Sequence, residues 1–291
     1  MKIAVHGKNF SREICHLVQN MFYELNLRNF DLYISSSFIE IIKESGISLG
    51  EHKIYAPGDD LSQFDFMFSM GGDGTFLESL THVGPHEIPI MGINTGRLGF
   101  LSTTPKEEYK KAIDQLENKK YVIEDRLLIH LDSDQNIFDK QNFALNEFAI
   151  LKRDSSSMIV VHTFINGEYL NSYWADGLLV STPTGSTGYN LSCGGPFMLP
   201  YSSNFIIAPI SAHNLNVRPM VVPDDCVISF RVESRSKNFL ASLDSRSETV
   251  DCDQHLSVRK ETFNARMVKL EGYSFLDTLR QKLNWGLDVR N

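Results

Sequence analysis

The segment from Phe68 to Leu77 constrains the fold most, because a short apolar strand runs through Gly-Gly-Asp-Gly-Thr into an apolar, helix-like stretch. Glycine admits backbone dihedrals that are closed to other residues and leaves room for a ligand's oxygen atoms beside the backbone. Amide groups at a strand-to-helix junction can point toward a bound anion. The pattern therefore predicts a phosphate-binding loop made by Gly71, Gly72, Gly74 and Thr75.

Asp73 lies inside this loop, where its charge would repel a phosphate. We therefore expect the carboxylate to have a chemical role, either accepting a hydroxyl proton or holding a metal ion. A tight glycine turn capped by an aspartate is the plainer alternative. The chain contains neither G-x-x-x-x-G-K-[ST] nor a complete G-x-G-x-x-G, since Leu77 replaces the third glycine. A Walker A loop and a standard Rossmann fingerprint are thus excluded.

The first hundred residues alternate between strand-like and helix-like segments. We expect strands at 2–6, 31–34, 65–69 and 88–93, a helix capped by Ser11, and a second helix at 38–44. Such alternation predicts an α/β domain with a parallel, doubly wound sheet, whose ligands bind beyond the carboxyl ends of the strands. The glycine loop falls at such an end.

The spacing of apolar residues changes in the rest of the chain. Residues 104–107 read as a capping box that starts a helix to about 119, and Asn166-Gly167 predicts a type I′ hairpin. Strand-like segments follow at 121–131, 144–151, 158–165, 168–174, 178–181, 205–207, 227–232 and 239–243. A helix at 274–285 is expected to pack back on the first domain. We therefore expect an α/β domain at 1–103, completed by about 272–291, and a mainly β domain at 104–271.

The composition and net charge of the chain limit the kinds of partner that it is expected to bind. A formal charge of -8 argues against nucleic acid or an anionic membrane as the main partner. The chain shows neither a signal peptide at its start nor an apolar run of about 18 residues, so we expect a cytoplasmic protein. The four cysteines form no C-x-x-C pair, and Gly84-Pro85 interrupts the helix that His82 and His86 would need to share a metal. We therefore predict no metal site built from protein side chains.

Three further segments carry candidate binding residues. The hydroxyl-rich stretch 181–192 follows a strand and suits a nucleotide, with a surface loop as the alternative. Asn146-Glu147 interrupts an apolar strand, so a side chain there needs a hydrogen-bond partner such as a ribose diol; a sheet edge or an interface is the alternative. Asp176 follows Trp174 and could mark a simple turn. The loop 94–100 offers Arg97 to a phosphate.

Taken in order, these motifs strongly resemble the NAD kinase family over most of the chain. The matching segments are Gly-Gly-Asp-Gly-Thr from Gly71, Asn-Thr-Gly-Arg-Leu-Gly-Phe-Leu from Asn94, Asn146-Glu147, Ala175-Asp176-Gly177, Thr-Pro-Thr-Gly-Ser-Thr from Thr182, and the closing stretch from Leu279 to Gly286. The glycine loop alone is shared with diacylglycerol- and sphingosine-type lipid kinases, whereas the hydroxyl-rich stretch is more specific. Gly188 stands where the family often has alanine, and Arg246 where it commonly has glutamine.

The resemblance implies an ATP:NAD 2′-phosphotransferase with an α/β domain and a β-rich domain. It assigns Asp73 as the catalytic proton acceptor. The implied phosphate- and nucleotide-binding residues are Gly71, Gly72, Gly74, Thr75, Asn94 and Arg97. The implied NAD-binding residues are Asp73, Gly74, Phe100, Asn146, Glu147, Asp176, Thr184, Thr187, Gly188, Tyr189, Asn190, Leu191, Ser192 and Arg246.

The resemblance also implies partners. NAD and ATP would be the substrates, with a divalent cation, expected to be Mg²⁺, bound mainly through substrate phosphates. Polyphosphate replaces ATP in some members, and a homodimer or homotetramer is expected. Two alternatives stay open at this point: a lipid or sugar kinase that shares the glycine loop, and a non-catalytic NAD(P)-binding sensor that keeps the pocket.

Overall fold

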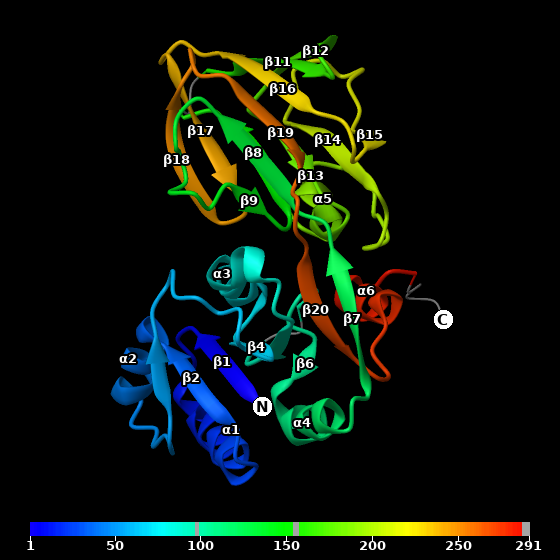
Figure 1. Ribbon diagram of the computed structural model, residues 1–291. Coiled ribbons are helices and arrows are strands. Elements are labelled where there is room, and N and C mark those ends of the chain that lie inside the picture. Colours follow the sequence, from blue (N-terminus) through cyan, green and yellow to red (C-terminus); the bar gives the residue numbers. More distant parts are fainter. Residues whose placement is uncertain (97–98, 154–156, 287–291) are drawn as a thin grey trace. The chain divides into compact units, whose positions relative to one another are not determined.

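The computed structural model describes residues 1–96, 99–153 and 157–286, which form two compact units (Figure 1). Unit 1 comprises residues 1–125 and the chain from 265 onward, and unit 2 comprises residues 126–264. The change of sequence period placed a division at residue 103. The compact units divide later because α4 (Tyr109–Glu117) buries Ala112, Ile113 and Leu116 in the core of unit 1.

Unit 1 is built on an eight-stranded sheet. Its strands are β1 (Lys2–Gly7), β2 (Asp31–Ser35), β3 (Lys53–Tyr55), β4 (Phe66–Met70), β5 (Ile90–Asn94), β6 (Thr104–Pro105), β7 (Tyr121–Arg126) and β20 (Ala265–Leu270). The main path runs β3-β2-β1-β4-β5-β20-β7, with β6 paired to β5. Parallel pairing joins β1 to β2 and β4, β2 to β3, and β5 to β4, β6 and β20. The predicted parallel α/β fold is confirmed.

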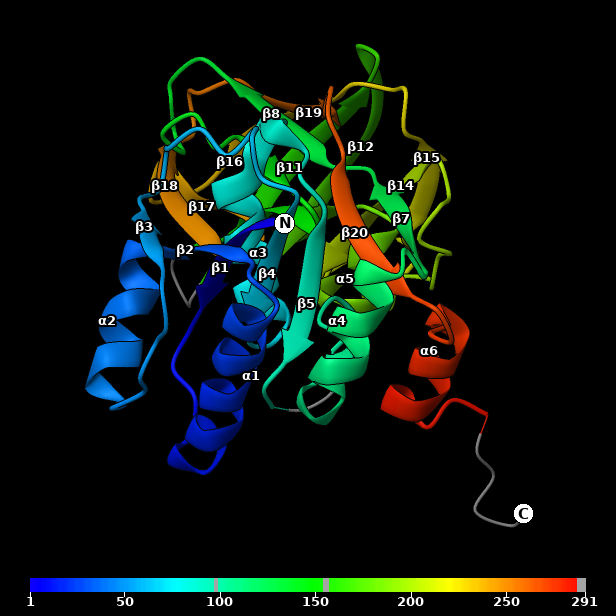
Figure 2. The same ribbon diagram turned by 60° about the horizontal axis from the view of Figure 1, so that its bottom comes forward.

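Helices cover both faces of this sheet (Figure 2). On one face α1 (Cys15–Leu27), α2 (Ser36–Glu44) and α4 bury their apolar stripes in one cluster with the strands. On the other face lies α3 (Asp73–Val83), which contacts β1, β4 and β5. Three short 3₁₀ turns complete the connections: η1 (Arg12–Ile14), η2 (Gly84–His86) and η3 (Lys106–Glu108).

Two predicted helix starts are wrong in detail. Ser11 precedes the turn η1 and makes no side-chain capping hydrogen bond, and α1 begins only at Cys15. The expected capping box at 104–107 does not form, because the buried Thr104 enters strand β6 beside β5 and α4 starts at Tyr109. The final helix behaves as predicted: α6 (Phe275–Leu283) lies in unit 1, where Phe275 contacts the ring of Phe100.

Unit 2 consists of two six-stranded antiparallel sheets that share one apolar core. The first sheet has the order β15 (Met220–Pro223), β14 (Asn204–Ile210), β13 (Gly177–Ser181), β10 (Glu147–Leu151), β17 (Asn238–Leu243), β18 (Arg246–Asp251). The second has the order β12 (Glu168–Ala175), β11 (Ile159–Ile165), β16 (Ile228–Glu233), β19 (Leu256–Lys260), β8 (Ile129–Ser133), β9 (Phe143–Ala144). The mainly β character predicted for this part of the chain is confirmed.

Local turn chemistry in unit 2 follows the sequence. Asn166 and Gly167 both have positive φ, of 52° and 83°, as a type I′ hairpin requires. Beyond β13 the chain forms a 3₁₀ turn, η4 (Thr184–Thr187), and the short helix α5 (Tyr189–Ser192). In the parts of the chain that the structure describes, no helix is long and apolar enough to cross a membrane.

Candidate active site

The glycine loop of unit 1 joins β4 to α3, as predicted. The helix begins at Asp73, inside the Gly-Gly-Asp-Gly-Thr motif, and the backbone N–H groups of Thr75 and Phe76 both donate to the Gly72 carbonyl at 3.1 Å. Gly71, Gly72 and Gly74 all avoid positive φ, so the expected use of unusual dihedrals is wrong. Space explains Gly71, because a Cβ there would lie 2.2 Å from Thr75 Oγ1, whereas a Cβ at Gly72 or Gly74 would meet no atom within 4 Å.

The Asp73 carboxylate is held by three successive backbone N–H groups. Phe100 donates to Oδ2 at 2.8 Å, and Leu101 and Ser102 donate to Oδ1 at 3.0 Å each. A Cβ at Gly99 would lie 1.8 Å from Oδ1, so glycine is required there for this approach. The carboxylate is thereby fixed in orientation, and its side chain keeps 29% exposure.

A lysine from the end of the chain stands beside this carboxylate. Lys282 on α6 places its Nζ 3.7 Å from Asp73 Oδ2 and 4.6 Å from the centre of the Phe100 ring. Sequence reasoning included the closing helix in the family resemblance but did not single out Lys282. Helical spacing gave no signal for it, because only the folded unit brings α6 to the glycine loop.

The loop after β5 is organised by Asn94, which is buried. Its Nδ2 donates to the Ser102 carbonyl at 3.2 Å, and its Oδ1 accepts from Gly96 N–H at 2.7 Å. Asn94 and Gly96 also line a cavity of about 460 Å³ in unit 1, together with Lys106, Tyr273 and other residues. Asn94 therefore shapes the loop whose later amides hold Asp73. Arg97 lies outside the described residues.

In unit 2, the backbone of the Asn146-Glu147 segment is hydrogen-bonded to a second carboxylate. Asp244 lies in the turn between β17 and β18 with φ of 53°. Its Oδ2 accepts from Leu145 N–H at 2.9 Å, and its Oδ1 accepts from Asn146 and Glu147 N–H at 2.8 and 3.2 Å. Sequence reasoning missed Asp244 as a positioning residue, because it lies 99 residues from Leu145 along the chain.

Glu147 has a strongly raised pKa. Burial, followed by the nearby Asp244 charge, raises its pKa to about 8, although a backbone hydrogen bond from Tyr189 acts in the opposite direction. Its Oε2 is buried and has no hydrogen-bond partner among the described residues. A buried polar atom left in this state is costly unless a ligand satisfies it.

The hydroxyl-rich stretch packs directly against this segment. A Cβ at Gly185 would lie 2.1 Å from the Asn146 carbonyl oxygen, so only glycine permits the contact. A Cβ at Gly188 would lie 3.3 Å from the Gly185 carbonyl oxygen and 3.4 Å from Glu147 Oε2, so the alanine common in the family would need the neighbouring backbone to shift by a few tenths of an ångström. Tyr189 is 39% exposed, and its pKa is raised by partial burial and by the charges of Cys193, Asp176 and Glu147. These predicted residues therefore do come together.

Other predicted residues of this stretch make internal contacts. The Thr187 hydroxyl donates to the Thr184 carbonyl at 3.2 Å, and Thr184 Oγ1 accepts from Arg126 Nη1 at 3.3 Å. The buried Asn190 amide donates to the carbonyls of Ser186 and Pro196. Leu191 and Ser192 lie beside it on α5.

Asp176 and Arg246 have different surroundings. Asp176 Oδ1 pairs with Lys152 Nζ at 2.6 Å. The guanidinium of Arg246 donates to the carbonyls of Gln141 and Phe143 and lies 5.6 Å from the centre of the Phe143 ring. Arg246 therefore stabilises the backbone around it, whereas Asp176 forms a side-chain ion pair, and the predicted contact of each with NAD remains a prediction.

Comparisons with known proteins identify the class to which this fold and these two loops belong. Residues 4–121 match the family model of the ATP-NAD kinase N-terminal domain, and residues 145–270 match that of the ATP-NAD kinase C-terminal domain. NAD kinases of Cytophaga hutchinsonii and Flavobacterium psychrophilum are 54% and 43% identical to this chain, in alignments that cover 100% of both partners.

Solved structures agree. Yeast NADH kinase, crystallised with NADH, superposes with a TM-score of 0.85 at 21% identity, covering 100% of this chain and 89% of that one. An NAD kinase from Archaeoglobus fulgidus in complex with ATP gives 0.74 at 27% identity, covering 98% and 99%. The chain therefore belongs to the NAD kinase family, whose members are phosphotransferases.

Proposed function

We propose that this chain transfers the terminal phosphoryl group of ATP to the 2′-hydroxyl of the adenosine ribose of NAD, giving NADP. Full-length likeness to NAD kinases supports the reaction class. The observation that carries the assignment to this chain is the oriented Asp73 carboxylate at the end of β4, in a loop open to a phosphate. The specific hydroxyl and the residue roles belong to the proposal.

Asp73 is the proposed proton acceptor. A carboxylate has about four lone-pair positions, and three amide hydrogen bonds leave one for a substrate hydroxyl. Fixed orientation matters more than base strength here, because phosphoryl transfer proceeds through a loose transition state that demands little of a base. Lys282, 3.7 Å from Asp73, adds a positive charge that would favour developing negative charge on the transferred group.

Asn146 and Glu147 are the proposed NAD-binding pair. The unpartnered Oε2 of Glu147 can accept a hydrogen bond from a ribose hydroxyl, which would remove the cost of burying that atom without a partner. Gly188 and Tyr189 would bound the same ribose or its base, since both lie against Glu147. Asp244 would act as a positioning residue by fixing the backbone of the pair.

The divalent cation is proposed to enter with the substrate phosphates. Asp73 belongs to no cluster of three metal-ligating side chains within the described residues. That donor set suits Mg²⁺, which keeps waters and binds through one carboxylate or none plus substrate phosphates. When bound, the cation would neutralise charge on the phosphates. A homodimer or homotetramer and a cytoplasmic location also remain predictions from the sequence.

The direct test is to incubate the purified chain with ATP, Mg²⁺ and NAD and to measure NADP with an NADP-specific dehydrogenase. We expect NADP to accumulate with time and enzyme concentration. Absence of NADP, with NAD binding intact, would instead favour a non-catalytic NAD-binding protein. Phosphorylation of a lipid or sugar in place of NAD would favour the kinases that share the glycine loop.

A further inference from the structure

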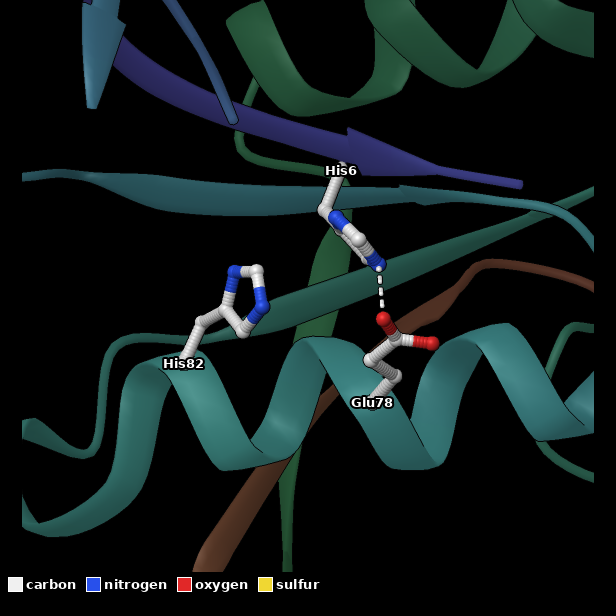
Figure 3. A group of neighbouring side chains, drawn as sticks. All are labelled: His6, Glu78 and His82. Carbon is white, nitrogen blue, oxygen red and sulfur yellow. Dashed lines mark ion pairs between the residues drawn. The ribbon is translucent and has the colours of Figure 1, made fainter. Parts of the chain in front are cut away.

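A cluster of two histidines and one glutamate, of which His6 is buried and the other two are partly exposed, lies in unit 1, outside the residues proposed for catalysis. His6 is near the end of β1, while Glu78 and His82 lie on α3 at i,i+4 spacing and thus on one face of the helix (Figure 3). One ligand atom from each of the three lies within 4.8 Å of the others. The sequence analysis considered His82 only with His86, rejected that pair because Gly84-Pro85 interrupts the helix, and so missed the neighbour of His82 that lies 76 residues earlier.

Hydrogen bonds distinguish the two ring nitrogens of each histidine in the cluster. His6 Nδ1 lies 2.8 Å from Ser35 Oγ, and His82 Nδ1 lies 3.1 Å from the hydroxyl of Tyr55. Both Nδ1 atoms are therefore engaged on the outer side of the cluster. The Nε2 atoms are the ones left for the space between His6, His82 and Glu78, and Figure 3 shows the rings turned toward that space.

The outer partners fit rings that carry their protons on Nδ1. Ser35 Oγ accepts from Phe38 N–H at 3.3 Å and can accept from His6 Nδ1–H, while its own proton can be donated to the Tyr55 oxygen. The Tyr55 oxygen can also accept from His82 Nδ1–H, while the Tyr55 proton points to Met67 Sδ at 3.8 Å. Every donor then has an acceptor. In this arrangement both Nε2 atoms present lone pairs to the centre.

The centre lacks a partner that would satisfy those lone pairs. His6 is 1% exposed, and its Nε2 has no hydrogen-bond partner among the described residues; Glu78 Oε1 is 3.5 Å away. Burial and then His82 lower the pKa of His6 to about 4, so the ring is neutral near pH 7. Burial also lowers the pKa of His82. Neutral imidazole is the form that binds metals.

Glu78 completes the donor set. Its Oε2 pairs with Lys8 Nζ at 2.6 Å, which leaves Oε1 facing His6. Burial acts to raise the pKa of Glu78, but Lys8 and His6 outweigh that effect, so the carboxyl is ionised. Lys8 is 57% exposed and can turn toward solvent when a cation arrives.

From this geometry we propose that His6, Glu78 and His82 bind one divalent transition-metal ion of the zinc class. Two imidazoles and one carboxylate suit Zn²⁺ and disfavour Mg²⁺, which prefers oxygen ligands alone. Bonds of about 2.0–2.1 Å require ligand atoms roughly 3.4 Å apart, so side-chain rotations on α3 must draw the set together. The hydroxyls of Ser35 and Tyr55 are the outer partners that orient the two rings.

The ion would tie β1 to the helix that starts with Asp73. It differs from the cation that accompanies ATP, because neither Asp73 nor any substrate phosphate takes part in its binding. The proposal therefore does not depend on the kinase reaction, and binding can be tested without ATP or NAD.

The test is a Co²⁺ titration of the tag-free, EDTA-stripped full chain at pH 7 in the presence of excess Mg²⁺, followed by displacement with Zn²⁺. We expect one Co²⁺ per chain, visible absorption bands of a low-coordinate site, loss of those bands with Zn²⁺, and a raised melting temperature. His82→Gln and Glu78→Gln, both at partly exposed positions, should each weaken binding at least tenfold. The matched control, His86→Gln, should bind as the unmodified chain does.

Less than half an equivalent of bound Co²⁺ would overturn the proposal. Binding that is unchanged in His82→Gln would overturn it equally, because the metal would then sit elsewhere. Circular dichroism of each variant shows whether a loss of binding reflects a lost ligand or a lost fold, and two independent ligand variants guard against the second case.

Discussion

Glu147→Gln should remove most of the pH dependence of stability that comes from the Asn146-Glu147 segment, the proposed NAD-binding pair. The folded protein raises the pKa of Glu147 from 4.5 to about 8. A group whose pKa is raised by folding holds its proton more tightly in the folded state. Its stabilising contribution is therefore present below about pH 4.5 and is lost as the pH rises through about 8.

The magnitude follows from that difference in pKa. Linkage gives a loss of about 3–4 kcal/mol in the free energy of unfolding of the unmodified chain between pH 5 and pH 9. Glutamine keeps the shape of the protonated carboxyl and cannot ionise. The variant should therefore be less destabilised at pH 9, while Asp244, whose pKa burial also raises, titrates in both proteins.

Urea unfolding at pH 5, 7 and 9 measures this effect. The chain has two tryptophans, and replacing Trp285 in unit 1 by phenylalanine leaves Trp174 to report on unit 2. Both proteins would carry this replacement. Parallel stability curves for the two, with no gap opening between pH 5 and pH 9, would refute the assignment of a raised pKa to Glu147.

Two further predictions concern the carboxylate of the glycine loop. Asp73→Asn should lower turnover by about 10²–10⁴ through loss of the proposed proton acceptor. It should also lower the free energy of unfolding by about 1–3 kcal/mol, because an amide NH₂ would face backbone N–H donors. Turnover within tenfold of the unmodified chain would show that Asp73 does not take part in the reaction. Gly99→Ala keeps the charge of Asp73 but displaces its carboxylate, since the added Cβ would lie 1.8 Å from Oδ1. We therefore expect a lower kcat with a nearly unchanged KM for NAD. An unchanged kcat would show that the three amide hydrogen bonds to Asp73 are not needed for catalysis.

The sequence predicted the elements of the fold well because hydrophobic period is a local property. Strands β1, β2, β4 and β5, helices α1 to α3, the Asn166-Gly167 hairpin and the return of the last helix all follow from patterns a few residues long. Strands β3, β15, β18, β19 and β20 were not predicted. Charged and hydroxyl residues dominate β18 and β19, and a strand whose outer side chains are solvated carries a weak apolar signal.

The candidate site likewise contains residues that the sequence could reveal and residues that only the fold reveals. Asp73 and Glu147 were recognisable because a carboxylate in a glycine loop, or inside an apolar strand, is costly without a function. Their supports were not recognisable: Asp73 is held by amides up to 29 residues away, and the Asn146-Glu147 segment is held by Asp244 across 98 residues. Lys282 and the His6 cluster likewise depend on contacts that only tertiary structure creates.

Arg246 is a residue that the sequence marks as unusual and that the structure explains. The sequence marked it as a departure from the glutamine common in the family. In the structure its guanidinium binds two backbone carbonyls and lies near two phenylalanine rings. Because these contacts depend on a planar, multiply donating group, the arginine has a structural reason to be there that is independent of any ligand.

The most direct test of the account uses an NAD analogue that lacks only the 2′-hydroxyl of the adenosine ribose. We expect calorimetry to show modestly weaker binding than NAD, because one polar contact is lost and a water can take its place. With ATP labelled at its terminal phosphate, NAD should acquire label and the analogue should acquire none. Label on the analogue would mean that another hydroxyl is the acceptor, and would contradict the proposed reaction.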